Sequence, residues 1–185
     1  MIDLFHERKI VAAVRSEDDI KNCLNSKCKI VFLLFGTLMT APEYIKELKE
    51  HGKSVFVHVD LIEGLSSSNS SIDYIDETTN ADGIISIKQN LLKYAKRLGF
   101  ITILRTFLLD SKSLEILQKI NMDSDIDILE ILPGIVLTAV PEEVKKIQKV
   151  IIGGGLIHTP QMVDQILAAG ASAVSTSDPH LWELL

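Results

Sequence analysis

The sequence contains few cysteines, and this scarcity limits the kinds of site it can form. Cys23 and Cys28 are the only two in 185 residues, and no histidine lies between or near them. Two cysteines at this spacing without a nearby histidine are weak evidence for a zinc centre, so we expect no metal site. We expect both thiols to be reduced and partly buried, as is usual in a cytosolic protein.

Long apolar runs and an excess of basic residues are also missing. No stretch approaches the roughly 18 apolar residues of a membrane span, and no basic amino-terminal region precedes an apolar run, so we expect a soluble, cytoplasmic protein. The net charge of −6 and the pI of about 5.4 argue against a protein whose whole surface grips nucleic acid, but allow a local basic patch. Aromatic residues, at 5%, are few for base stacking.

The remaining composition is that of an ordinary globular protein. Hydrophobic residues make up 46% of the chain and charged residues 24%, which excludes a disordered chain. A length of 185 residues is enough for one sizeable core and short for two. We therefore expect residues 1–185 to form a single domain.

Short apolar segments alternate along the chain with longer amphipathic ones. Segments such as "IVFLLFG" are apolar throughout, which is typical of parallel strands covered on both faces. Ser, Asp, Thr or Pro begin the amphipathic segments, and Gly or Asn end several of them, as expected of helix caps. The predicted strands are 10–15, 30–36, 55–60, 83–87, 101–107, 128–133, 150–154 and 173–177. The predicted helices are 16–25, 41–52, 71–80, 89–99, 110–121, 141–149 and 159–170, with a short cover at 178–185.

This alternation predicts parallel βαβ units, and eight of them can close into a TIM-barrel-like (β/α)8 fold with short loops. An open, doubly wound sheet is the alternative, because the chain is shorter than a typical barrel. Closure is favoured by the eight strands and by the polar residues at the carboxyl ends of nearly all of them. Function in such a barrel lies where the strands end and the following loops begin.

The last two predicted strands end in an unusual pair of motifs. The strand "VIIGGG" ends in Gly153, Gly154 and Gly155, and the next strand ends in "STS", residues 175–177. Glycines leave backbone N–H groups uncovered and hydroxyls add donors, so two such strand ends side by side could cradle a phosphate. Glycines also permit tight packing between strand and helix, which is the structural alternative.

Charged residues gather at the same predicted rim, which favours a small phosphorylated polyol or sugar as the ligand. Each of them also has a second interpretation. Arg105 and Glu130 could pair with each other, and His58 could be a buried core residue. Asp60 and Glu130 could act as acid and base. Lys88 could be an electrostatic contact or a Schiff-base nucleophile. The rim residues are Arg15, His58, Asp60, Lys88, Arg105 and Glu130.

Basic residues on two predicted helices are the only candidates for contact with a polyanionic partner. Such charges usually form solvated faces. They are Lys93, Lys96, Arg97, Lys145, Lys146 and Lys149. The serine-rich loop "GLSSSNSSIDY" is expected to be a solvated connection, with a lid over the mouth as the alternative.

The motifs "HVDLIEG" and "EILPGI", with "IIGGGLIHTPQMVDQILAAGASAVSTSDPHLW", closely resemble the GlpP family of glycerol uptake operon antiterminator regulatory proteins. The resemblance runs from residue 12 to residue 182. It implies a (β/α)8-like protein that senses glycerol 3-phosphate and acts on the leader of a glycerol-utilisation messenger RNA, without catalysis, cofactor or metal. By matching motifs, the six rim residues would line the ligand pocket, and the phosphate would be held by Gly154, Gly155, Thr176 and Ser177.

Two functions of different classes therefore remain open. One is a glycerol 3-phosphate-responsive transcription antiterminator that binds leader mRNA. The other is a phosphosugar isomerase or aldolase that uses Asp60 or Glu130 as a base or Lys88 as a nucleophile. Barrels host both binding and chemistry, so the fold alone does not choose between them. A homo-oligomer, most often a symmetric dimer, is expected on general grounds.

Overall fold

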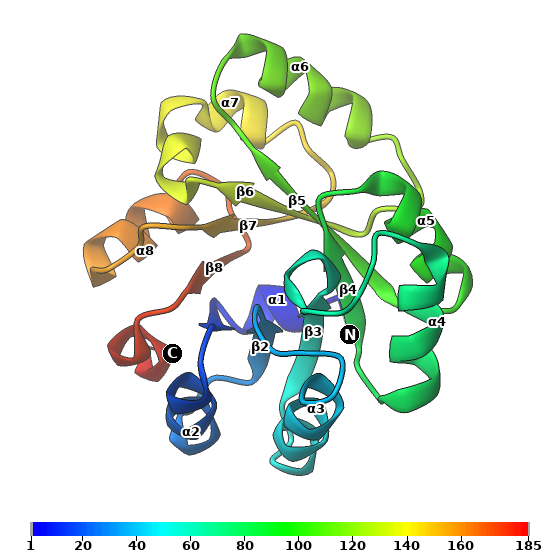
Figure 1. The fold of residues 1–185 in the computed structure, drawn as a ribbon. Coiled ribbons are helices and arrows are strands. Elements are labelled where there is room, and N and C mark those ends of the chain that lie inside the picture. The colour runs from blue at the N-terminus through cyan, green and yellow to red at the C-terminus, as the bar shows by residue number, and fades with distance from the viewer. Residues whose placement is uncertain (1, 185) are drawn as a thin grey trace.

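A computed structural model of the protein describes residues 2–184 and confirms the closed barrel. Each strand pairs in parallel with the next, and β1 pairs with β8 to close the sheet, so the open-sheet alternative is wrong. Figure 1 shows the strands in a ring with helices outside it. The strands are β1 (Ile10–Val14), β2 (Ile30–Leu33), β3 (Ser54–His58), β4 (Gly83–Ser86), β5 (Ile101–Phe107), β6 (Ile128–Leu132), β7 (Val150–Gly154) and β8 (Ala173–Thr176).

The predicted helices form in the expected order, and a short helix before the first strand and a 3₁₀ helix after the sixth are present that were not predicted. The predicted helix 141–149 is a single turn, because the 3₁₀ helix η2 (Gly134–Ala139) already packs on β7 and occupies the space of a covering helix. No helix within residues 2–184 is both long and apolar enough to cross a bilayer. The helices are α1 (Leu4–Glu7), α2 (Glu17–Asn25), α3 (Ala41–Glu50), α4 (Asn69–Thr78), α5 (Gln89–Arg97), α6 (Ser111–Ile120), α7 (Pro141–Val144) and α8 (Pro160–Ala168), with 3₁₀ turns η1 (Val59–Leu61) and η3 (Pro179–Glu183).

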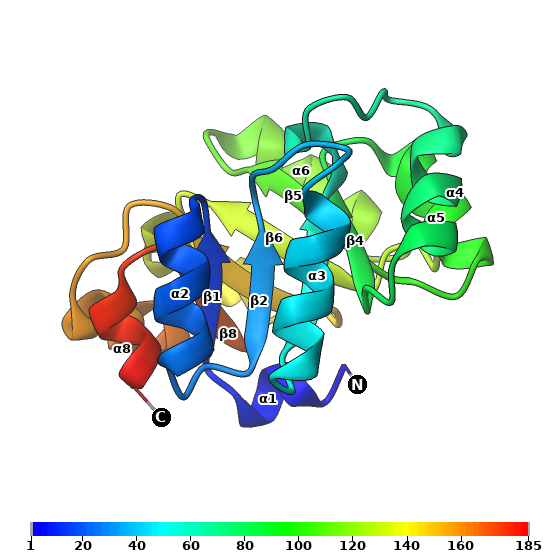
Figure 2. The ribbon, with the colours of Figure 1, turned by 60° about the horizontal axis from the view of Figure 1, so that its bottom comes forward.

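Two apolar layers explain why the strands are hydrophobic on both faces. One set of side chains, including Val11, Phe32 and Ile152, fills the barrel interior, and a larger set packs between the sheet and the helices. Helix α1 lies below the amino-terminal ends of the strands in Figure 2, where Phe5 is fully buried with its ring centroid 5.3 Å from that of Phe56. The barrel is therefore plugged at this end and open for function at the other.

Two similar sets of hydrogen bonds connect helices and strands at the amino-terminal end of the barrel. The Asp82 carboxylate accepts hydrogen bonds from Lys49 Nζ and from the backbone N–H of Val55, both at 2.7 Å. On the next part of the ring, a carboxylate before β6, Asp127, accepts from Lys96 Nζ at 2.6 Å and from a β5 backbone N–H at 3.0 Å. Each set of hydrogen bonds connects a helix to two strands, so these carboxylates stabilise the fold.

Candidate functional site

Three consecutive glycines end β7, and each is required for a different reason. A Cβ on Gly153 would lie 2.5 Å from an isoleucine of α8, so its absence lets helix and strand pack closely. A Cβ on Gly154 would lie 2.4 Å from Ser175 Oγ and 2.9 Å from Glu130 Oε1, inside the barrel mouth. Gly155 has a φ of +79°, a left-handed conformation that glycine adopts without strain. Packing accounts for the first glycine, whereas the other two shape the mouth.

The turn after β7 leaves backbone donors uncovered. Leu156 has a φ of +59°, which is rare for a residue with a side chain and costs on the order of 1–3 kcal/mol. Its side chain is 74% exposed, so packing does not explain this conformation. The backbone N–H groups of Gly155, Leu156 and Ser177 have no hydrogen-bond acceptor within residues 2–184. Successive free N–H groups in a turn form a concavity that suits an anion.

A cavity of about 280 Å³ opens at this mouth. Its volume is just below the roughly 300 Å³ at which pockets begin to take drug-sized ligands, so it suits a small metabolite. His158 and Leu156 line it although the sequence did not predict them, because the turn conformation brings them there. The lining includes the predicted residues Arg15, Arg105, Glu130, Gly155, Thr176 and Ser177.

A buried ion pair forms one wall of the cavity. Arg105 Nε donates to Glu130 Oε2 at 2.6 Å, and Ser175 Oγ donates to Glu130 Oε1 at 2.7 Å. The side chains of Glu130 and Arg105 are 2% and 12% exposed. The pairing considered from sequence is therefore present. Because Arg105 uses only Nε, its two terminal NH₂ groups have no acceptor within the described residues and remain free to donate to a ligand.

The hydroxyl of Thr176 has a structural role. Thr176 Oγ1 donates to the backbone oxygen of Ile157 at 2.8 Å and accepts from the N–H of Asp178 at 3.1 Å. Trp182 Nε1 donates to the Thr176 carbonyl at 2.8 Å. These bonds hold the β7–α8 loop and η3 against the end of β8. The rim beside Ser177 is consequently fixed rather than loose.

His58, Asp60 and Lys88 form a second group, on the β3 and β4 side of the mouth. Asp60 Oδ2 accepts from Ser86 Oγ at 2.7 Å and from the backbone N–H of Ile87 at 3.0 Å. Burial opposes ionisation of Asp60, but these hydrogen bonds, with His58 and Lys88, outweigh it and lower the pKa. Lys88 Nζ lies 3.4 Å from Asp60 Oδ1 and also donates to a serine of the loop before α4, which fits an electrostatic contact.

His58 is a buried, neutral histidine with an unused ring nitrogen. It is 2% exposed, and its Nδ1 has no hydrogen-bond partner within the described residues, the nearest carboxylate oxygen of Asp60 being 3.7 Å away. Burial, and then the positive charge of Arg105, lower the pKa of His58 to about 4. A buried polar atom without a partner is uncommon and calls for a water or a ligand atom.

The low pKa of His58 predicts an acid-sensitive fold. Between its ordinary pKa of 6.5 and about 4, the unfolded chain binds a proton that the folded chain does not, so stability falls as pH falls through this range. The loss amounts to about 3 kcal/mol at the acid end. Urea unfolding across this pH range should show the loss in the wild type and not in His58→Gln. Parallel pH profiles for the two proteins would contradict the assignment.

Most of the basic residues predicted to contact a polyanion are engaged within the protein. Lys93, Lys96 and Lys145 form ion pairs with neighbouring carboxylates at 3.8, 2.6 and 2.8 Å. Lys149 Nζ donates to two backbone carbonyls at 2.6 Å each, and burial lowers its pKa. Within residues 2–184, Arg97 and Lys146 have neither an ion pair nor a side-chain hydrogen bond to a carbonyl.

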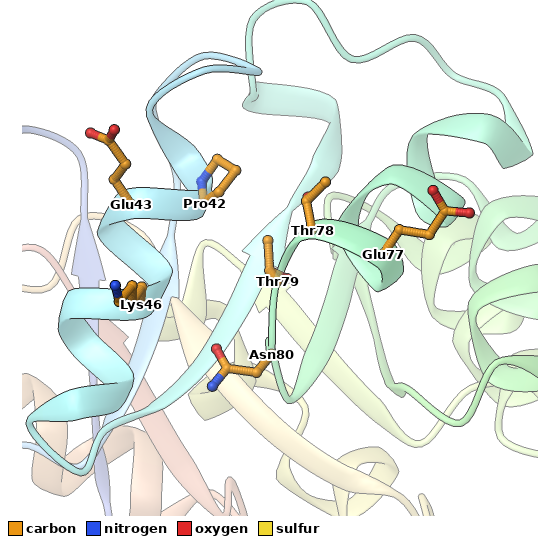
Figure 3. A pocket seen from close by; sticks show the side chains of 7 residues that line it. All are labelled: Pro42, Glu43, Lys46, Glu77, Thr78, Thr79 and Asn80. Carbon is orange, nitrogen blue, oxygen red and sulfur yellow. The ribbon is translucent and has the colours of Figure 1, made fainter.

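A larger hollow, of about 460 Å³, lies outside the barrel. Figure 3 shows its lining, which comes from α3 on one side and from the end of α4 and the following segment on the other. The charged residues there, Glu43, Lys46 and Glu77, are exposed and of both signs. Such a groove holds no buried polar atom that needs a ligand, so the mouth is the stronger candidate.

Metal and thiol chemistry find little support in the described part of the chain. Within residues 2–184, no three His, Cys, Asp or Glu side chains are grouped so as to hold a metal ion. Cys23 and Cys28 are buried and unbridged. Burial raises the pKa of the Cys23 thiol to about 12, which makes it a poor nucleophile at neutral pH.

Comparison with known proteins gives one consistent match over nearly the whole chain. A family model described as "Glycerol-3-phosphate responsive antiterminator" matches residues 10–182. The Escherichia coli K12 protein YgcP is 34% identical over 184 residues, covering 100% of this chain and 96% of YgcP. The glycerol uptake operon antiterminator regulatory protein of Listeria monocytogenes has a TM-score of 0.88 and 32% identity, covering 96% of each chain. A related Thermotoga maritima protein has a TM-score of 0.84 and 34% identity, covering 96% and 99%.

Enzymes with this barrel are more distant. The N-acetylmannosamine-6-phosphate 2-epimerase of Clostridium perfringens has a TM-score of 0.70 and 15% identity, covering 95% of this chain and 88% of the enzyme. At this identity the likeness shows the fold alone.

Proposed function

Because the chain belongs to the glycerol-3-phosphate responsive antiterminator family, we propose that it is a metabolite-controlled, cytoplasmic regulator of transcription without catalytic activity. In this proposal glycerol 3-phosphate binds at the barrel mouth. The liganded protein then binds the leader mRNA of a glycerol-utilisation operon and lets transcription pass a terminator.

The free backbone donors at the ends of β7 and β8 are the observation that carries the proposal. Gly155, Leu156 and Ser177, whose N–H groups have no acceptor within residues 2–184, line a cavity that Arg15 and Arg105 also line. Backbone donors and two guanidinium groups together suit a dianionic phosphate. Gly154 contributes by having no side chain at this point, and the phosphate lies over it.

We then assign the hydroxyl groups of the ligand as hydrogen-bond donors to the carboxylates of Glu130 and Asp60. Glu130 lines the cavity, and its two oxygens can accept from a ligand hydroxyl in addition to their present partners. Asp60 and the unpartnered Nδ1 of His58, with Lys88 beside them, are proposed for the far end of the polyol. Thr176 takes part through its backbone, because its hydroxyl is already used.

Ligand control of RNA binding follows from linkage. Glycerol 3-phosphate raises RNA affinity only to the extent that it binds the RNA-competent state more tightly. The coupling is reciprocal, so the leader RNA must raise the affinity for glycerol 3-phosphate by the same factor. The proposal includes a homo-oligomeric RNA-competent state. Measurement of the molecular mass in solution with and without ligand tests this part.

Calorimetric titration with glycerol 3-phosphate tests the proposed ligand, with glycerol and inorganic phosphate as controls. We expect saturable binding of glycerol 3-phosphate with a Kd on the order of micromolar, and at least about tenfold weaker binding of either half. Incubation should form no product. Absence of binding at millimolar ligand would reject the proposal.

The enzyme alternative is an outcome of the same experiment. Turnover of a triose or hexose phosphate that disappears in Lys88→Ala would favour an isomerase or aldolase. We favour the regulator because the family match covers residues 10–182 and because Lys88 forms an ion pair with Asp60 beside the mouth.

A further inference from the structure

Four basic residues gather at the opposite end of the barrel from the mouth. Arg8 and Lys9 immediately precede β1, and Lys27 and Lys29 immediately precede β2. Together with Glu7 they line a hollow of about 270 Å³. In Figure 2 the starts of β1 and β2 lie at the bottom of the barrel, next to α1 and the carboxyl-terminal segment. We call these four residues the amino-terminal basic face.

Among residues 2–184, no carboxylate forms an ion pair with the amino-terminal basic face. Arg8, Lys27 and Lys29 are exposed, and Lys9 is half-buried. Glu7 lines the hollow and Glu183 lies near Cys28, so the described residues place four cations beside two acids here, on a chain whose net charge is −6.

Firm backbone contacts hold these cations in place. The N–H of Val174 donates to the carbonyl of Lys9 at 2.8 Å, and the N–H of Ser54 donates to that of Lys29 at 2.8 Å. Lys53 Nζ donates to the Cys28 carbonyl at 2.7 Å, between the two lysines of the second pair. The backbone that carries these side chains is therefore anchored to the sheet, so no backbone ordering is needed when they bind.

We propose that the amino-terminal basic face is the surface that holds the phosphate backbone of RNA, an inference that rests on the proposed function. Unpaired lysine and arginine side chains on one face are the electrostatic footprint of nucleic-acid binding. The residues that line the hollow within the described chain include no aromatic side chain, so this face contacts phosphates and not stacked bases.

The fold connects this face directly to the ligand cavity. Lys9 immediately precedes β1 and Arg15 immediately follows it, and Lys29 and Leu34 flank β2 in the same way; both Arg15 and Leu34 line the cavity. The two flanking residues of such a strand are about 17–20 Å apart, at roughly 3.3 Å per residue. Ligand at one end and RNA at the other therefore contact the same two strands.

Charge reversal on this face tests the proposal. The full-length protein, saturated with glycerol 3-phosphate, is titrated with a labelled leader transcript of a glycerol-utilisation operon at several salt concentrations. Lys27→Glu with Lys29→Glu should weaken RNA binding about 10- to 100-fold, and the neutral Lys27→Gln with Lys29→Gln should lower the salt slope by about 2, one for each lysine.

A matched variant and a ligand measurement separate the outcomes. Lys145→Glu with Lys146→Glu makes the same charge change on the surface first considered for RNA, and should leave RNA affinity within about twofold. All variants should keep wild-type affinity for glycerol 3-phosphate, which shows that they are folded. Loss of RNA binding in the second pair but not the first would overturn the proposed surface and leave the regulator standing. No RNA binding by the liganded wild type would reject both.

Discussion

Replacing Gly154 with alanine is expected to weaken glycerol 3-phosphate binding by at least about 100-fold, or about 2.8 kcal/mol. The new Cβ would lie 2.4 Å from Ser175 Oγ and 2.9 Å from Glu130 Oε1, which is too close for either atom. Both atoms belong to the hydrogen-bonded wall of the cavity, so the methyl group must displace that wall or enter the proposed phosphate site. Calorimetric titration of the variant measures the effect.

A second glycine provides the control for this substitution. Gly99 has a φ of +93°, and a Cβ there would meet no atom within 4 Å. Gly99→Ala should therefore cost about 1 kcal/mol of stability through backbone strain and leave ligand affinity unchanged. Thermal unfolding of both variants separates the two effects. Normal binding by Gly154→Ala would place the phosphate elsewhere in the barrel.

The barrel itself could be predicted because its signal is repeated eight times. Apolar strands covered on both faces alternate with amphipathic helices, and every predicted strand overlaps an observed one with its ends within three residues. The exception is the segment 141–149, where a helical pattern forms one turn. Tertiary packing of η2 on β7 decides this case, through a glycine contact that local sequence does not report.

The site was predicted less completely than the fold, because the ends of the strands indicate which residues lie at the rim but not how they are arranged there. The sequence predicted a single group of charged residues at the rim. In the structure, Arg15, Arg105 and Glu130 line the cavity, whereas His58 and Asp60 belong to a separate group on the β3 and β4 side. Alternation along β8 could have separated the inward Ser175 from Thr176. The contribution of His158 had no such signal, because it depends on the left-handed Leu156.

Except for the local pair of Lys145 with Glu142, the contacts of the surface lysines were beyond sequence reasoning for another reason. Lys96 and its partner Asp127 are 31 residues apart, and Lys149 reaches carbonyls more than 20 residues away. Such pairs exist only once the ring is closed. The amino-terminal basic face was missed because its residues come from two separate strand starts, with two cations at each.

Removing the Glu130 carboxylate is the second change with a large expected effect. Glu130→Ala should lower the free energy of unfolding by about 3–5 kcal/mol, because it leaves the mostly buried Arg105 cation without its partner. It also leaves the Ser175 hydroxyl without the acceptor that it contacts at 2.7 Å. Urea unfolding at neutral pH measures the change.

A double variant tests whether the stranded charge and the missing side-chain volume together cause this loss. Replacing both partners, as Glu130→Leu with Arg105→Met, removes the charge pair but refills the space, so it should cost at least about 2 kcal/mol less than Glu130→Ala alone. The stable double variant should still fail to bind glycerol 3-phosphate, because both Arg105 and Glu130 line the cavity. Equal losses of stability in the single and double variants would mean that neither the stranded charge nor the missing volume accounts for the loss, and would contradict this explanation.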